Sequence, residues 1–123
     1  MKRFFLFAAA PLLWLSDTDC NRKGEAGKLK GRLEITGLCM NYTIKLQEGY
    51  PGTGSVEANW TDEVTGIQYE NVFRLGNPCS FPASLKKGDE FYFSIDTSTQ
   101  KPCTVCLAYY PTPSKTLSIK VIE

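Results

Sequence analysis

Residues 91–110, FYFSIDTSTQKPCTVCLAYY, are the part of the sequence that decides the predicted fold. Apolar and polar residues alternate over 91–95, which is the period of a strand with one buried face. After a polar turn, residues 104–110 are expected to form a second strand. Cys103 and Cys106 stand at the start of this second strand, so we expect at least one distant cysteine to be bonded to it.

The same alternation recurs along the rest of the chain and predicts an all-β domain of six to seven short strands. No segment keeps the 3.6-residue period of a helix. Strands of this kind form a small antiparallel barrel or a β-sandwich. We favour an OB-like barrel over an immunoglobulin-like sandwich, because the long first strand has a glycine bend at Gly37 and residues 86–89 turn directly into the next strand. The other expected strands are 29–37, 40–47, 55–60, 67–75 and 117–121.

Length and composition narrow the classes of function. The chain has 123 residues, enough for one domain, and a net charge of +1 from 14 basic and 13 acidic residues. Nucleic-acid-binding domains usually carry a basic stripe, so no nucleic-acid partner is expected. The chain has no histidine, which removes Ser-His and Cys-His nucleophile systems and histidine-ligated metals. We expect no catalytic residue, no metal site and no cofactor.

Residues 1–19 are expected to be a signal peptide. Lys2 and Arg3 give it a positive start, and residues 4–15 form an apolar run. A helix that spans a bilayer needs about 20 apolar residues, so this run fits the hydrophobic region of a signal peptide better. A buried helix is disfavoured, because Pro11 would break it and it has no polar face.

Cys20 follows the leader directly, and we interpret it as a lipidation site that leaves 20–27 as a polar tether and 28–123 as a single β domain. Ordinary cleavage by signal peptidase is the alternative. Residues 17–19, DTD, replace the small apolar residues expected before a lipidated cysteine, yet no small-x-small pair lies at the right depth for ordinary cleavage either. Lipidation at Cys20 leaves four other cysteines, an even number that can pair completely.

Those four cysteines, Cys39, Cys79, Cys103 and Cys106, are expected to form structural disulfides. Cys103 and Cys106 could instead suggest a redox centre or half of a zinc site. A thioredoxin-like centre needs a helix at its first cysteine, and a four-cysteine zinc site usually has two close pairs. Residues three apart on a strand lie about 10 Å apart, beyond the roughly 7 Å that a disulfide spans. We therefore favour long-range bridges from Cys103 and Cys106 to Cys39 and Cys79, although a turn at 101–103 would permit a Cys103–Cys106 bridge.

Three aromatic residues, Trp60, Tyr109 and Tyr110, are candidates for a ligand-binding face. Exposed rings on an OB-like barrel can stack sugars or bases, although such residues more often fill the core. On a strand, Tyr109 and Tyr110 point to opposite faces, so one of them should be exposed. Asn41 and Asn59 match the N-x-[ST] glycosylation pattern, which has a meaning only if the leader is eukaryotic.

The short apolar leader ending at Cys20, the polar tether and the β domain together resemble the small exported proteins and lipoproteins of Bacteroidetes-type bacteria. The resemblance covers the full length and rests on this organisation, not on a catalytic motif. It implies a location in the cell envelope, in the periplasm or at the outer membrane or cell surface, with the membrane contacted only through the N-terminal lipid. It implies no activity.

We therefore expect a non-enzymatic envelope module that binds a protein or a glycan through one face or its loops. The alternative is an exported thiol–disulfide or metal-handling protein that uses Cys103 and Cys106. Thiol titration separates the two, because a structural framework has no reactive thiols after export. A small carboxylate-based hydrolase is a third hypothesis, and no motif in the sequence supports it.

Overall fold

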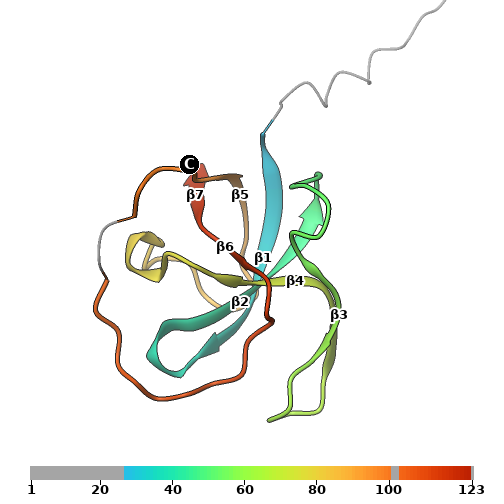
Figure 1. The fold of residues 1–123 in the computed structure, drawn as a ribbon, viewed down its shortest axis with the longest axis vertical. Coiled ribbons are helices and arrows are strands. Elements are labelled where there is room, and N and C mark those ends of the chain that lie inside the picture. The colour runs from blue at the N-terminus through green and yellow to red at the C-terminus, as the bar shows by residue number, and fades with distance from the viewer. Residues whose placement is uncertain (1–26, 101–102, 123) are drawn as a thin grey trace, which may run out of the picture.

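The computed structural model describes residues 27–100 and 103–122, which form one curled β-sheet (Figure 1). The all-β fold class is confirmed. The predicted signal peptide and Cys20 lie outside the described residues. In chain order the elements are β1 (Leu29–Gly37), the 3-10 turn η2 (Leu38–Met40), β2 (Asn41–Glu48), β3 (Glu57–Thr61), β4 (Gln68–Leu75), the 3-10 turn η3 (Pro78–Ser80), β5 (Glu90–Ile95), β6 (Thr116–Leu117) and β7 (Ile119–Ile122).

The strands follow the order β3-β4-β2-β1-β5-β7, and every neighbouring pair on this path is antiparallel. β6 lies off the path and pairs in parallel with β4. Because one residue separates β6 from β7, the last part of the chain pairs first with β4 and then with β5. A single curled sheet fits the OB-like alternative and not the sandwich. The contact of β6 with β4 covers only two residue pairs, so the sheet is not closed into a complete barrel.

β1 is the long strand between β2 and β5, and it follows the predicted period of two. Leu29, Gly31, Leu33 and Ile35 are buried, while the residues between them are at least partly exposed. Its register with β2 shifts between Lys30 and Gly31 and again between Leu33 and Ile35. Irregularities of this kind bend a strand and increase its twist, which allows so long a strand to curl with the sheet.

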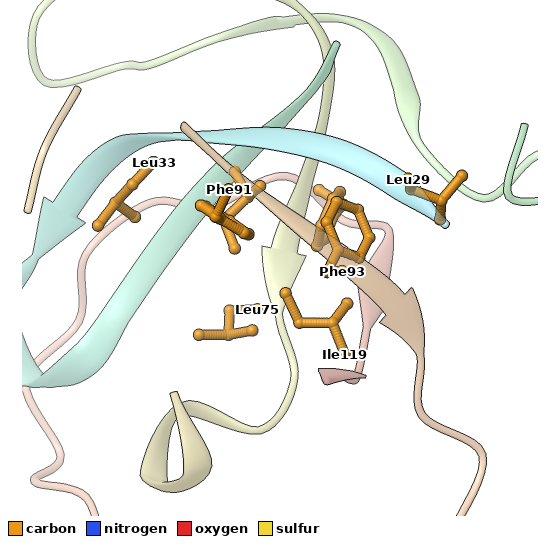
Figure 2. Packing of buried hydrophobic residues seen from close by; sticks show 8 residues of the cluster. Leu29, Leu33, Leu75, Phe91, Phe93 and Ile119 are labelled. Carbon is orange, nitrogen blue, oxygen red and sulfur yellow. The ribbon is translucent and has the colours of Figure 1, made fainter. Parts of the chain in front are cut away.

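The core is a cluster of eight buried hydrophobic residues contributed by β1, β2, β4, β5 and β7. Phe93 is fully buried, with its ring centroid 5.9 Å from that of Phe73 and 5.8 Å from that of Phe91. Gly31 makes room for this ring, since a Cβ at position 31 would lie 2.9 Å from Phe93 Cε1. Figure 2 shows Phe93 among the side chains that β1, β4 and β7 contribute. The cluster consists of Leu29, Leu33, Ile44, Phe73, Leu75, Phe91, Phe93 and Ile119.

Two predicted strands differ from the structure. Residues 104–110 form no strand, because no neighbouring strand pairs with them and Leu107 is 98% exposed. The prolines that follow, Pro111 and Pro113, have no backbone N–H for a ladder. The predicted strand over 117–121 is divided at Ser118, where the chain changes its partner from β4 to β5.

Asn77, just after β4, is a buried polar residue that the sequence analysis did not single out. Its Nδ2 donates a hydrogen bond to Ile119 O at 2.7 Å, and its Oδ1 accepts one from Ile119 N at 2.9 Å. The backbone of Gly76 donates to Leu117 O at 2.8 Å just before it. The side-chain amide of Asn77 therefore continues the pairing of β4 with β6 onto the first residue of β7.

Asn77→Ala is expected to lower the free energy of unfolding by about 2–4 kcal/mol. The substitution leaves the buried N–H and C=O of Ile119 without partners, and each such group costs about 1–3 kcal/mol. Asn59→Ala is the matched control, because Asn59 is exposed on β3, and a change within about 0.5 kcal/mol is expected there. Urea denaturation with the disulfides intact measures both, and equal losses would contradict the role assigned to Asn77.

Candidate functional site

Two disulfides tie residues 103–113 to two turns of the sheet. Cys106 is bonded to Cys39 in η2, with Cα atoms 5.2 Å apart, and Cys103 is bonded to Cys79 in η3, with Cα atoms 5.8 Å apart. The prediction of two long-range bridges is confirmed, although its premise of a strand that starts at Cys103 is wrong. The sulfurs of Cys103 and Cys106 belong to different bridges and form no C-x-x-C pair. Structural disulfides persist in oxidising compartments, which agrees with an exported protein.

One end of the molecule carries most of the exposed hydrophobic side chains. Ten large hydrophobic residues are exposed in the part of the chain that the structure describes. Three of them are Tyr50, Tyr92 and Ile122, and the other seven lie in η2, in the β3–β4 turn (62–67) and in 103–110. Figure 1 shows these segments at the lower edge of the molecule, away from the start of β1 and from the C-terminus. We call the six most exposed of the seven the apolar tip: Leu38, Met40, Val64, Ile67, Leu107 and Tyr109.

The turn η2 is held to the neighbouring loop in a strained conformation. Cys39 and Met40 have φ angles of 57° and 62°, in the left-handed region that disfavours residues other than glycine. Besides the disulfide at Cys39, Asn41 Nδ2 donates to Leu38 O at 2.7 Å and to Ala108 O at 3.3 Å. Backbone strain of this kind costs about 1–3 kcal/mol per residue and persists only where the surroundings enforce it. The Asn41 side chain thus has a structural role in the described fold.

Asp62 joins the β3–β4 turn to the same loop. Its side chain is 1% exposed, its Oδ1 accepts from Val64 N at 2.8 Å, and its Oδ2 accepts from the Tyr110 hydroxyl at 3.2 Å. Gly37 makes room for the Tyr110 ring, because a Cβ at position 37 would lie 2.7 Å from Tyr110 Cδ1. One oxygen of Asp62 thus stabilises the β3–β4 turn, and the other fixes the end of the loop.

The three aromatic residues predicted for a ligand face lie near this turn in different environments. Tyr109 is 75% exposed, and its hydroxyl donates to Glu63 Oε2 at 3.5 Å. Tyr110 is half-buried against Asp62. Trp60 is half-buried beside Tyr69 of β4, with ring centroids 5.9 Å apart. Of the three predicted residues, Tyr109 is therefore the one that presents a ring to solvent.

Two tyrosines near Asp62 have raised pKa values. Burial raises the pKa of Tyr110 above its ordinary value of 10.0, and the charge and hydrogen bond of Asp62 raise it further. Burial also raises the pKa of Tyr69, with the charges of Glu34 and Asp62 adding to the effect. A tyrosine with a raised pKa binds its proton more tightly in the folded protein than in the unfolded chain. Its contribution to stability is complete below the unfolded pKa and is lost as the pH rises through the folded pKa, so stability should fall above about pH 10.

Asp62→Asn is expected to lower the pKa of Tyr110 toward 10.0, because it removes the carboxylate charge and leaves burial and the charge of Tyr69 to raise it. Spectrophotometric titration of tyrosinate measures this change, and Tyr110→Phe identifies the transition that belongs to Tyr110. Glu63→Gln is the neighbouring control, since the Glu63 carboxylate lies at Tyr109. A titration that Asp62→Asn leaves unchanged would contradict the assignment.

A second candidate site is a cleft of about 420 Å³ formed by residues 46–54 with Val56 and Asn71. It includes the end of β2 and the loop after it, so it lies away from the apolar tip. Glu48 is the only carboxylate among its lining residues, and no cysteine or lysine lines it. The cleft therefore offers no pair of carboxylates for acid–base chemistry, and the apolar tip is the stronger candidate.

Within residues 27–100 and 103–122, no group of three or more histidine, cysteine, aspartate or glutamate side chains is placed to hold a metal ion. In the same ranges, no helix is long and apolar enough to span a lipid bilayer. Comparisons of the chain with protein-family models, with curated proteins and with solved structures give no match.

Sequence reasoning missed the aliphatic part of this surface. Leu38 and Leu107 each neighbour a cysteine of the Cys39–Cys106 disulfide, and both were read only as parts of an expected strand or its border. A usable signal was present, because Leu38 stands at a break between two strands and prolines follow the segment that contains Leu107. An apolar residue fixed beside a disulfide in an irregular segment has no sheet face to bury it.

Proposed function

We propose that the protein is an exported, non-enzymatic binding module of the cell envelope, stapled by two disulfides and anchored by lipid at Cys20. The observation that carries the binding role is the apolar tip. Its exposed hydrophobic side chains lie on η2 and the loop 103–110, which a disulfide joins, and on the β3–β4 turn. Exposed apolar surface that is concentrated in one place usually marks a site of interaction. The tip offers aliphatic side chains and methionine with a single exposed ring, which suits a protein partner better than a glycan.

The connectivity supports the same surface. In OB-like barrels, ligands bind at the loop between the first two strands and at the loop between the last two. In this chain the first of these loops is η2. The second is the long connection between β5 and β6, when β6 and β7 are counted as one strand interrupted at Ser118. The Cys39–Cys106 disulfide joins these two loops. This support is an analogy at the level of the fold, and the side chains of the tip carry the proposal.

The mass of the intact protein, recovered from its native envelope with and without reduction, tests the anchored, stapled module. We expect the mass of one diacyl or triacyl group on a chain that starts at Cys20. Reduction of the Cys39–Cys106 and Cys79–Cys103 bridges should add four hydrogens. Free thiols at Cys103 and Cys106 would instead favour the thiol–disulfide alternative, and a mass without lipid would refute the anchor.

Site-specific photo-crosslinking in intact cells tests the binding surface. A photoreactive residue at Leu107 or Leu38 should crosslink to another macromolecule, because both side chains are largely exposed. The same residue at Tyr92, an exposed position on β5 outside the tip, should give no such product. The binding role is wrong if the tip positions crosslink no more than position 92.

A further inference from the structure

The apolar tip lies on three segments of the chain that contain acidic residues and no basic residue. These segments, 37–41, 62–67 and 103–110, include Asp62 and Glu63 but no lysine or arginine, although the whole chain has 14 of them. The Asp62 carboxylate is buried and bonded within the fold. Glu63 is exposed, with its Oε2 3.5 Å from the Tyr109 hydroxyl. Glu63 therefore supplies the exposed charge of these three segments.

A partner that covers this surface must satisfy two chemical requirements. It must bring apolar side chains to bury residues such as Leu107 and Leu38, which are 98% and 64% exposed. It must also pair the Glu63 carboxylate, because burial of an unpaired charge is strongly unfavourable. We infer that the apolar tip binds a polypeptide segment that combines apolar side chains with at least one lysine or arginine. The inference rests on the proposed binding role and adds the chemistry of the partner.

The same observations disfavour three other occupants. Two copies that met through their tips would place one Glu63 near the other without a basic residue in either tip to separate them. A nucleic acid would need the basic residues that these segments lack. An anionic bilayer would need them as well. The nine residues of β1 also separate Leu29, the end nearest the tether, from η2, a distance of roughly 26 Å at about 3.3 Å per residue. The described chain therefore enters the sheet at the end of β1 opposite η2.

The conformation of η2 suits a preformed docking surface. Met40 is 41% exposed. Its φ of 62° lies in the left-handed region, which disfavours residues other than glycine. The Cys39–Cys106 bridge and Asn41 hold this turn in place before any partner binds. A surface fixed in advance loses little conformational entropy on association, so a short peptide segment can bind it. Met40→Gly consequently offers a variant that removes an exposed side chain and relieves strain at the same position.

A random dodecapeptide library displayed on phage is the probe for this inference. The full chain is produced with export to a bacterial periplasm, so that processing and disulfide formation occur, and is then immobilised for selection. Enriched peptides should contain more apolar residues and more lysine and arginine than the starting library. No enrichment, or enrichment of acidic peptides, would overturn the inference.

Four variants assign the selected peptides to the surface. Leu107→Ser and Met40→Gly should each weaken binding of a selected synthetic peptide by about tenfold, the loss of one good apolar contact. Tyr92→Ser should leave the affinity unchanged, because Tyr92 lies outside the tip. Glu63→Lys should reverse the charge preference, so that a peptide with glutamate in place of lysine binds better. The far-ultraviolet circular dichroism and urea midpoint of each variant confirm that it is folded.

The outcomes separate the two proposals. If Leu107→Ser weakens binding but Glu63→Lys does not change the charge preference, the binding role stands and the cationic partner is wrong. If Leu107→Ser and Tyr92→Ser behave alike, the apolar tip is not the binding surface and both proposals fail. If Leu107→Ser instead abolishes flotation with phosphatidylglycerol-containing vesicles, or dissociates a dimer seen by sedimentation, the occupant is a bilayer or a second copy and the peptide inference is overturned.

Discussion

Serine substitution of both Cys39 and Cys106 is expected to lower the free energy of unfolding by about 4 kcal/mol. The bridge closes a loop of 67 residues along the sequence, and a long loop loses much conformational entropy when it is closed in the unfolded chain. The loss should also be local, because this disulfide joins η2 to the segment that carries Leu107. Without it, the Asn41 amide, which donates to Leu38 O at the end of η2, should exchange with solvent faster, and the apolar tip should lose its fixed arrangement.

The matched control is serine substitution of both Cys79 and Cys103. That bridge spans 24 residues, and the chain-entropy relation gives about 3 kcal/mol for it, roughly 1 kcal/mol less. Urea denaturation of the two double variants compares the stabilities, and hydrogen exchange followed by mass spectrometry compares the loops. The assignment would be contradicted if the Cys79 and Cys103 variant lost more stability, or if the Asn41 amide stayed protected without the Cys39–Cys106 bridge.

The strands β1 and β5 could be predicted because each of them buries one face. The alternation of buried and exposed residues in β1, and the buried positions of Phe91 and Phe93 in β5, follow directly from a period of two. The β3–β4 hairpin was predictable from a polar turn between two alternating segments, although β3 itself has no buried residue. Patterns of this kind report burial within one segment and do not depend on knowing its partners.

Residues 104–110 were mispredicted because strand formation also requires a partner. The segment has β-branched and aromatic residues that favour a strand, yet β7 occupies the free side of β5 and β6 pairs with β4. The ladder position that the segment would need is already filled by a later part of the chain. The competition between segments for a place beside β5 depends on the topology of the whole sheet, and the local sequence of 104–110 does not predict it.

The candidate site was predictable only in part. The cysteine count gave the two bridges, and the adjacent tyrosines gave one exposed ring, Tyr109. The hydrophobic residues around it depend on where the disulfides hold η2 and the loop, and on the left-handed backbone at Cys39 and Met40. The exposure of Leu107 therefore follows from cross-links between distant residues, which cannot be predicted from its neighbours in the sequence.

Phe93→Ala is expected to lower the free energy of unfolding by about 3–5 kcal/mol, the usual cost of removing a buried aromatic ring. Phe93 is fully buried and contacts the rings of both Phe73 and Phe91. It also occupies the space above Gly31, so its removal opens a cavity between β1 and β5 that a rigid sheet can fill only partly. Phe93→Leu should cost less, because it leaves a smaller cavity, and it keeps the comparison possible if the alanine variant does not fold.

Tyr92→Ala provides the control for this core prediction. Tyr92 precedes Phe93 but is 42% exposed, and its ring lies 4.7 Å from Lys28 Nζ. A contact of this kind at an exposed site contributes about 0.5–1 kcal/mol. Denaturation of the disulfide-intact variants should separate the two neighbours clearly. Similar losses at both positions would mean that the alternation of faces assigned to β5 is wrong.

The close approach of Phe93 to Gly31 makes a stronger test through a double-mutant cycle. Gly31→Ala places a Cβ about 2.9 Å from Phe93 Cε1 in the wild-type protein, a clash that should cost about 1–3 kcal/mol. In the Phe93→Leu background that aromatic atom is absent, so Gly31→Ala should cost clearly less, and the two substitutions should be coupled by at least about 0.5 kcal/mol. Strict additivity would show that the glycine is required by the backbone or by Ile44, whose Cγ2 is the next contact at 3.1 Å, and not by the ring. Coupling would instead establish that Gly31 and Phe93 together set the separation of β1 and β5, and with it the curl of the sheet that places η2 beside the loop.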